Sequence, residues 1–184
     1  MDPQLVARAQ GGDRAAFASI VGLALPGLDR VARLITRDPD RAKDAVQEAL
    51  VKAWRDLPAL REPARFDAWL RQLLVRSCMD ELRRSRRMSG HVELIEMHHP
   101  VIGDVAMSVG DRDALERAFR RLDPEQRALV VLHYYQDLAL DEAAAALRIP
   151  VGTAKSRLSR ARDTLRAALE ADARPARAAV GGQI

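Results

Sequence analysis

Apolar residues recur along most of the chain at the spacing expected for one face of an α-helix. Between residues 40 and 57 they keep the 3.6-residue period without a miss, and a wider apolar arc follows in residues 66–87. No segment shows the alternation of apolar and polar positions that is typical of a strand. The pattern therefore predicts an all-α protein.

The first half of the chain is predicted to form one small helical domain, residues 1–87. Asp13 precedes a helix over 14–25, Pro26-Gly27 is expected to interrupt it, and a helix over 28–36 follows. The regular helix over 40–57 comes next. Residues 58–65 contain two prolines and are predicted to be a loop before the last helix, 66–87.

The second half is predicted to form another small helical domain, residues 111–171, after a linker over 88–110. The linker contains three acidic residues and no Lys or Arg, so we expect it to be flexible and negatively charged. Helices are expected over 111–122, from Asp123 to about 136, from a cap at Asp141 to about 147, and over 152–170. The tail, 172–184, is expected to be disordered.

Composition narrows the function classes further. The 30 Lys and Arg residues give a pI of about 9.8, but they indicate a polyanionic partner only if they gather on one face. The single cysteine, Cys78, excludes an internal disulfide and a Cys-based zinc site. No signal peptide is recognised, and no apolar run reaches the roughly 20 residues of a membrane span. We therefore expect a cytoplasmic protein with no membrane insertion.

The last two predicted helices have the pattern of a helix-turn-helix, with Arg148-Ile149-Pro150 as the turn. If Ala154, Leu158, Ala161, Leu165 and Leu169 point inward, the opposite face carries small hydroxyls between long cations, which suits the DNA major groove. This recognition face consists of Gly152, Thr153, Lys155, Ser156, Arg157, Ser159, Arg160 and Arg162.

A second face of the helix over 40–57 is also informative. Opposite its apolar stripe lie Asp44, Gln47, Glu48, Val51 and Arg55, here called the docking face. Asp44 and Glu48 repel each other at i,i+4, and Val51 is apolar among charged residues. The pattern fits either an ordinary surface or a protein-docking stripe with an apolar anchor and a charged rim.

Cations and aromatic residues are interleaved in residues 61–87. Such a pattern suits single-stranded nucleic acid, because cations neutralise phosphates and aromatic rings stack on bases. This arginine face consists of Arg61, Arg65, Phe66, Trp69, Arg76, Arg83 and Arg86. Trp54 and Trp69 also fall on apolar stripes, which favours core packing for both, and Asp80 is expected to pair with Arg76 or Arg84.

Four segments together resemble the extracytoplasmic-function sigma factors, the compact two-domain branch of the bacterial sigma family. They are DAVQEALVKAW (44–54), FDAWLRQLLVRSCMDELRRSRR (66–87), LDPEQRALVVLHYYQDLALDEAAAAL (122–147) and IPVGTAKSRLSRAR (149–162), and the match covers about 160 residues in order. The resemblance implies a subunit that binds core RNA polymerase and directs promoter-specific initiation. It implies no catalytic residue, no metal and no cofactor.

The resemblance also implies a role for each face. The docking face would bind the clamp coiled coil of the largest polymerase subunit, and the second-largest subunit's flap would be a further contact. The arginine face and loop 58–65 would capture the melted minus-ten strand, and the recognition face would read the duplex minus-thirty-five element. The acidic linker would thread through the RNA path of the polymerase, and an anti-sigma factor is a possible partner.

Two other classes remain open on the residues alone. A free-standing helix-turn-helix regulator would explain the C-terminal half but neither the docking face nor the acidic linker. A helical adaptor would explain the docking face but not the recognition face. An enzyme is disfavoured, because the sequence has no Gly-rich phosphate loop and no evident catalytic acid pair, and the adjacent His98 and His99 lack helical metal-ligand spacing.

Overall fold

The computed structural model describes residues 1–88 and 109–180, and these residues contain helices and no strand. The chain divides into two compact units, residues 1–97 and 98–184. The predicted all-α fold with two small helical domains is confirmed. Most of the predicted linker, together with His98 and His99, lies outside the described residues, while Met88, Val109 and Gly110 are helical rather than part of a linker.

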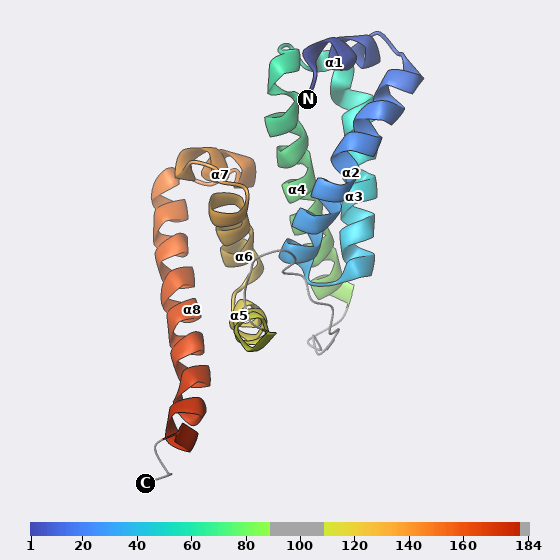
Figure 1. Cartoon of the computed structure of the whole chain (residues 1–184). Helices are drawn as coiled ribbons and strands as arrows, with labels where there is room; N and C mark the ends of the chain where they lie inside the picture. The colour runs from blue at the N-terminus through green and yellow to red at the C-terminus, as the bar shows by residue number, and fades with distance from the viewer. Residues whose placement is uncertain (89–108, 181–184) are drawn as a thin grey trace. The chain divides into compact units, whose positions relative to one another are not determined.

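The first unit is a bundle of three long helices with a short helix across one end (Figure 1). Its elements are α1 (Pro3–Gln10), α2 (Arg14–Thr36), α3 (Pro39–Asp56), the single 3-10 turns η1 (Leu57–Ala59) and η2 (Pro63–Arg65), and α4 (Phe66–Met88). Helix α3 packs against both α2 and α4. It can do so closely because its buried face consists mainly of alanines: Ala42, Ala45, Ala49 and Ala53.

Helix α2 is continuous through Pro26, where the sequence analysis placed a break, so that prediction is wrong. A proline inside a helix leaves the carbonyl four residues earlier without its donor. That residue is Gly22, and it is exposed, so water can hydrate its carbonyl. Burial of Ile20 before the proline and Leu28 and Val31 after it holds both halves against the same core.

The 23 residues of α2 are long and apolar enough, with a mean hydropathy of 1.4, to pass for a membrane span by length and composition. This differs from the expectation that no apolar run is long enough to cross a membrane. One side of α2 is buried in the unit through Ile20, Val31 and Ile35, and its other side carries the partly exposed Arg33–Asp29 ion pair, with 2.6 Å between Nε and Oδ2. We therefore assign α2 to the core of the first unit.

The second unit contains α5 (Val109–Arg120), α6 (Pro124–Val130), the π-helical turn η3 (Val131–Tyr135), α7 (Leu140–Leu147) and α8 (Val151–Val180). Helix α8 contacts α5, α6 and α7. The predicted start at Asp123 is confirmed. Its carboxylate accepts from Gln126 N at 2.8 Å, while the Gln126 side chain accepts from Asp123 N at 3.1 Å.

Two details of the second unit correct the sequence analysis. The cap of α7 is Ala139, not Asp141, and Glu142 Oε2 accepts from Ala139 N at 3.0 Å. Helix α8 continues to Val180, so residues 172–180 are helical and not disordered. Ala and Arg are strong helix formers and dominate this segment despite Pro175. The ion pair between Arg117 Nε and Asp172 Oδ2, at 2.9 Å, ties α8 to α5.

Candidate nucleic-acid and partner interfaces

The docking face lies on the solvent side of α3. Asp44, Gln47, Glu48, Val51 and Arg55 are all exposed. Val51 is 55% exposed, so much of its apolar surface is open to solvent. An exposed apolar side chain with a charged border is the arrangement of a protein contact.

An apolar groove borders the docking face between α2 and α3, a feature that the sequence analysis missed. Apolar residues dominate its walls, and charged residues lie at its edge. The lining residues are Phe17, Val21, Leu25, Pro26, Asp29, Arg33, Pro39, Asp40, Lys43, Val46, Gln47, Leu50, Val51 and Trp54. Because α2 contributes six of the fourteen lining residues and α3 the others, no single-helix pattern could predict the groove.

Trp54 is part of this groove rather than of the core. The sequence analysis placed it on the apolar stripe, but its side chain is 38% exposed and its ring packs on Phe17 with 4.9 Å between centroids. A large apolar body that is only partly covered is common at the centre of protein interfaces. Trp54 therefore extends the apolar part of the docking face beyond Val51.

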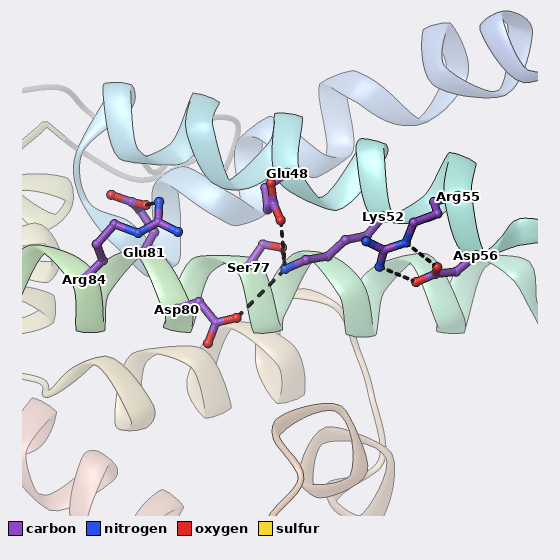
Figure 2. Close-up of polar contacts among 8 residues, drawn as sticks. All are labelled: Glu48, Lys52, Arg55, Asp56, Ser77, Asp80, Glu81 and Arg84. Atoms are coloured by element: carbon purple, nitrogen blue, oxygen red, sulfur yellow. Dashed lines mark hydrogen bonds and ion pairs between the residues drawn. The ribbon is translucent and has the colours of Figure 1, made fainter.

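Lys52 joins the docking face to α4, as Figure 2 shows. Its Nζ lies 3.3 Å from Glu48 Oε1, 3.4 Å from Ser77 Oγ and 4.0 Å from Asp80 Oδ2. Asp44 and Glu48 are expected to repel each other, but the Lys52 ammonium lies beside Glu48 and offsets part of this repulsion. The expectation that Asp80 pairs with Arg76 or Arg84 is wrong, because Asp80 faces Lys52 and Arg83 (3.5 Å), while Arg84 pairs with Glu81 (3.1 Å).

Arg55 at the end of the docking face pairs with its neighbour Asp56, also in Figure 2. Its Nε lies 2.7 Å from Asp56 Oδ1 and its terminal nitrogen 3.1 Å from Oδ2. The hydrogen bond from Arg55 lowers the pKa of Asp56, and the same bond raises the pKa of Arg55. Both side chains remain open to water, so little free energy is lost if Arg55 leaves Asp56 and pairs with a group on a partner protein.

The arginine face is divided between the α3–α4 loop and α4. Arg61, Arg65, Arg83 and Arg86 are exposed, and Arg76 is half-buried. Arg65 Nε is held 2.6 Å from Glu62 Oε2. The exposed cations can meet a polyanion without unfolding any part of the unit.

The predicted role of Phe66 in the arginine face is corrected by its burial. It is 1% exposed and belongs to the largest fully buried side chains, so it cannot stack on a base. It occupies the first position of α4, where its ring fills the core beneath the loop. Trp69 is half-buried and packs on Phe66 with 5.8 Å between ring centroids, so the predicted core contact of Trp69 is only partial and one part of the ring is accessible.

The recognition face of α8 is open to solvent. Gly152, Lys155, Ser156, Ser159, Arg160 and Arg162 are exposed, and Thr153 and Arg157 are half-buried. The predicted inward residues Ala154, Leu158 and Ala161 are buried. Farther along α8, Leu165 is half-buried and Leu169 is 37% exposed, although both were expected to point inward. Ala168 is buried instead of Leu169, so the buried face of α8 shifts around the helix beyond residue 161.

The turn before α8 aims this face outward. Arg148 adopts the left-handed conformation, with φ of 55°, and ends α7 with bonds from its N–H to the carbonyls of Ala144 and Ala145. On α8, Ser156 Oγ donates to Thr153 O at 3.0 Å, and Arg160 Nε donates to Ser156 O at 3.3 Å. The bond uses only the Nε–H of Arg160, so the terminal N–H groups of its guanidinium can still donate to a DNA base or phosphate.

The described residues contain no group of three or more His, Cys, Asp or Glu that could hold a metal ion. Cys78 is fully buried, and burial raises the pKa of its thiol to about 12. The features that the structure does bring together are an exposed recognition helix, exposed arginines and an apolar docking surface. Such a combination is typical of a helical protein that binds both nucleic acid and another protein.

Comparison with known proteins gives this class a family. Residues 20–88 match the family described as Sigma-70 region 2, and residues 112–165 match Sigma-70, region 4. The ECF RNA polymerase sigma factor SigM of Mycobacterium tuberculosis is 36% identical over 164 residues, which cover 89% of this chain and 82% of that protein. The RNA polymerase sigma-E factor of Streptomyces coelicolor is 31% identical over 91% of this chain and 93% of its own length.

Two solved structures are also similar. CnrH, solved in complex with the cytosolic domain of CnrY, has a TM-score of 0.65 and 28% identity over 93% of this chain and 98% of that one. The sigma factor RpoE of Bartonella quintana, solved with the anti-sigma factor NepR, has a TM-score of 0.65 and 28% identity over 84% of this chain and 96% of that one.

The chain belongs to the extracytoplasmic-function sigma factors of RNA polymerase. It is a promoter-recognising subunit that binds core RNA polymerase and promoter DNA, and it is not an enzyme. Its activity is therefore transcription initiation. The two alternatives, a free-standing helix-turn-helix regulator and a helical adaptor, do not apply.

Proposed function

We propose that the three faces divide promoter-specific initiation among them. The docking face binds the clamp coiled coil of the largest polymerase subunit. The arginine face holds the melted minus-ten strand, and the recognition face reads the duplex minus-thirty-five element. The observation that carries this division is that the exposed apolar residue Val51 lies on α3, whereas exposed cations lie on the other helices α4 and α8.

Val51 supports the docking assignment because it is apolar, exposed and adjacent to the groove that Trp54 and Leu25 line. Burial of such a patch by a partner releases water from apolar surface. Asp44 and Glu48 border the patch and are exposed, so a basic partner surface would complement them.

The exposed positions of Arg61, Arg65, Arg83 and Arg86 support binding of the single strand through its phosphates. With Phe66 buried, Trp69 is the aromatic residue of this face that can stack on a base, through the accessible part of its ring. The proposal therefore assigns phosphate contacts to the arginines and at most one stacking contact to this face.

On α8, the shorter side chains Thr153, Ser156 and Ser159 alternate with Lys155 and Arg160. Small hydroxyls allow the helix to approach base edges, and the long cations reach guanine or phosphate. A Cβ added at Gly152 would meet nothing within 4 Å, so a phosphate could approach the start of α8 on that side.

Four further parts of the proposal rest on the family. The second-largest polymerase subunit, through its flap, is a further contact, and the protein acts in the cytoplasm, where polymerase and promoter DNA meet. An anti-sigma factor is a possible regulator, because CnrH and RpoE were each solved with a partner and NepR is described as an anti-sigma factor. The acidic residues of 88–110 are proposed to follow the RNA path.

Two substitutions test the docking assignment. Glu48→Lys reverses the charge beside Val51, and Val51→Asp places a carboxylate in the apolar anchor. Val51 is exposed, so Val51→Asp should change the free energy of unfolding by no more than about 0.5 kcal/mol. Glu48→Lys also loses the ion pair with Lys52, so its loss should reach about 1 kcal/mol at most. Binding to core RNA polymerase, measured by fluorescence anisotropy of the labelled protein, should weaken at least tenfold. This is the size of effect expected when an anchor residue of an interface is replaced.

Glu170→Lys is the charge-matched control, because Glu170 is exposed on α8 and does not belong to the docking face. It should leave core binding unchanged. Full core binding by Val51→Asp, with normal stability, would show that the docking face does not contact the polymerase.

A further inference from the structure

Helix α1 holds the loop between α3 and α4 through one side chain. Gln10, the last residue of α1, donates from Nε2 to the carbonyl oxygens of Leu60 at 2.6 Å and Leu57 at 3.2 Å. These bonds connect residues about fifty positions apart. Helix α1 also contacts η1 and η2 and lies across the end of the bundle (Figure 1). It precedes residues 20–88, where the family match begins.

The loop has weak hydrogen bonds of its own, although Leu57 and the contacts of η1 and η2 with the neighbouring helices also hold it. It consists of two single 3-10 turns, η1 and η2, which are short and have weaker hydrogen-bond geometry than an α-helix. Leu60 N donates to Leu57 O at 3.0 Å, and Arg65 N donates to Glu62 O at 2.9 Å. Leu57 is buried, whereas Pro58, Ala59 and Arg61 are exposed. The Gln10 amide ties the carbonyl just before Arg61 to α1.

Helix α1 is itself anchored, so the bond can transmit its position to the loop. Val6 is fully buried and Ala9 is 2% exposed. The turn into α2 is fixed by Asp13, whose carboxylate accepts from Ala16 N at 2.9 Å and lies 2.7 Å from the Arg8 guanidinium. Gln10 thus projects from a fixed helix end and not from a free terminus.

We propose that Gln10 is a positioning residue for minus-ten strand capture and that α1 acts as a brace for the α3–α4 loop. By accepting the Gln10 amide, the carbonyls of Leu57 and Leu60 hold Arg61 in the place from which it meets the melted strand. A preordered loop binds more tightly, because the ordering cost is not paid at the moment of binding. The inference rests on the proposed role of this loop in DNA capture.

Gln10→Glu is the sharpest test, because the carboxylate has nearly the same shape as the amide but cannot donate to a carbonyl. Gln4→Glu is the matched control, being the same change on an exposed residue of the same helix. Each variant is assembled with core polymerase. Open-complex formation is then followed on the promoter that the wild-type holoenzyme uses most strongly in a randomised-promoter transcription library.

We expect Gln10→Glu to slow open-complex formation about tenfold, the order expected from loss of two hydrogen bonds. Core binding and closed-complex binding to the duplex should stay within about twofold of wild type. Hydrogen exchange of the free protein should rise in residues 57–65 and stay unchanged in α3 and α4. Gln4→Glu should match wild type in every measurement. This pattern would separate positioning of the loop from general loss of structure.

Arg61→Ala distinguishes failure of this inference from failure of the proposed function. If Arg61→Ala slows opening and Gln10→Glu does not, the loop captures DNA but needs no brace, and the inference is overturned. If neither variant slows opening, the loop is not a DNA-binding element, and the proposed role of the loop fails. Faster exchange throughout the first unit of Gln10→Glu would also overturn the inference, because Gln10 would then be a general stabilising residue.

Discussion

At the scale of single residues, the chemistry of a side chain could be predicted better than its surroundings. The exposed state of Glu48 and Val51 follows from the period of one helix, and the structure has both exposed. Phe66 shows the limit, because its place beside arginines resembles a stacking site, whereas the first turn of α4 directs its ring into the core. The contacts of Lys52 with α4 could not be predicted from the sequence either, because they depend on how α3 and α4 pack against each other.

Lys52 gives a prediction at this scale. Its ammonium lies between Glu48 and Asp80, so Lys52→Met leaves two carboxylates near each other without their shared cation. The side chains are 25%, 54% and 55% exposed, and solvent screens the interactions. Unfolding in urea should therefore show a loss of about 0.5–1 kcal/mol in low salt. The loss should shrink in 1 M NaCl. A loss that is large and independent of salt would mean that packing, and not charge, is the role of Lys52.

Cys78 gives a second prediction. Burial raises the pKa of its thiol to about 12, so almost no thiolate is present at neutral pH, and the sulfur is also shielded. The folded protein should resist iodoacetamide at pH 7.5 for hours, and it should react within minutes in 8 M urea, as followed by mass spectrometry. Rapid modification of the folded protein would show that α4 opens far more often than a packed core helix.

At the scale of elements, helix positions followed from sequence pattern, but their ends and continuity depended on neighbours. Alanines at a helical period predicted the buried face of α3, and Asp123 with Gln126 predicted the start of α6. Pro26 did not end α2, because tertiary burial on both sides outweighs one lost hydrogen bond. The inward stripe of α8 was correct through Ala161 and then changed from Leu169 to Ala168, since the part of the unit beneath α8 changes along its length.

The recognition helix supports a prediction that separates base contacts from phosphate contacts. Arg160 lies at the centre of the recognition face and Arg162 at its flank, and both are exposed. Arg160→Ala should cost about 1–3 kcal/mol and relax the base preference at one upstream position. Arg162→Ala should weaken all promoters alike and reduce the salt dependence by about one unit of slope. Open-complex formation by the holoenzyme on a set of single-base promoter variants distinguishes the two effects.

The same uniform loss for both variants on every promoter would contradict this placement of α8. Lys155→Ala provides a comparison from the same face, and its effect on base preference would show whether the groove contact extends one turn toward the start of α8.

At the scale of the whole molecule, two units were predictable because the composition changes sharply after residue 87. The groove between α2 and α3 was not, because it is formed by residues about thirty positions apart whose packing no local pattern records. The extent of α8 was underestimated for a different reason. Pro175 and the polar Arg residues resemble a disordered tail in composition, yet Ala and Arg also favour helix.

The sequence-based expectation of a flexible link over 88–110 gives a prediction at this scale. Trypsin has no site inside it, because the segment lacks Lys and Arg, whereas a glutamate-specific protease can cut after Glu93 and Glu96. Brief digestion should cut there first and release two fragments that remain helical by circular dichroism. Early cleavage after Glu48 or Glu142, with residues 90–108 protected, would contradict a flexible link between two independent units.

The most direct test of promoter recognition is reconstituted transcription. Core RNA polymerase is combined with this protein and given a library of templates with randomised minus-thirty-five and minus-ten elements, and the transcripts are sequenced. We expect a single preferred pair of elements. Arg160→Ala should change the preference only in the upstream element, and Val51→Asp should abolish specific transcripts altogether. Core polymerase that initiates with the same template preference in the presence and absence of this protein would contradict the assignment.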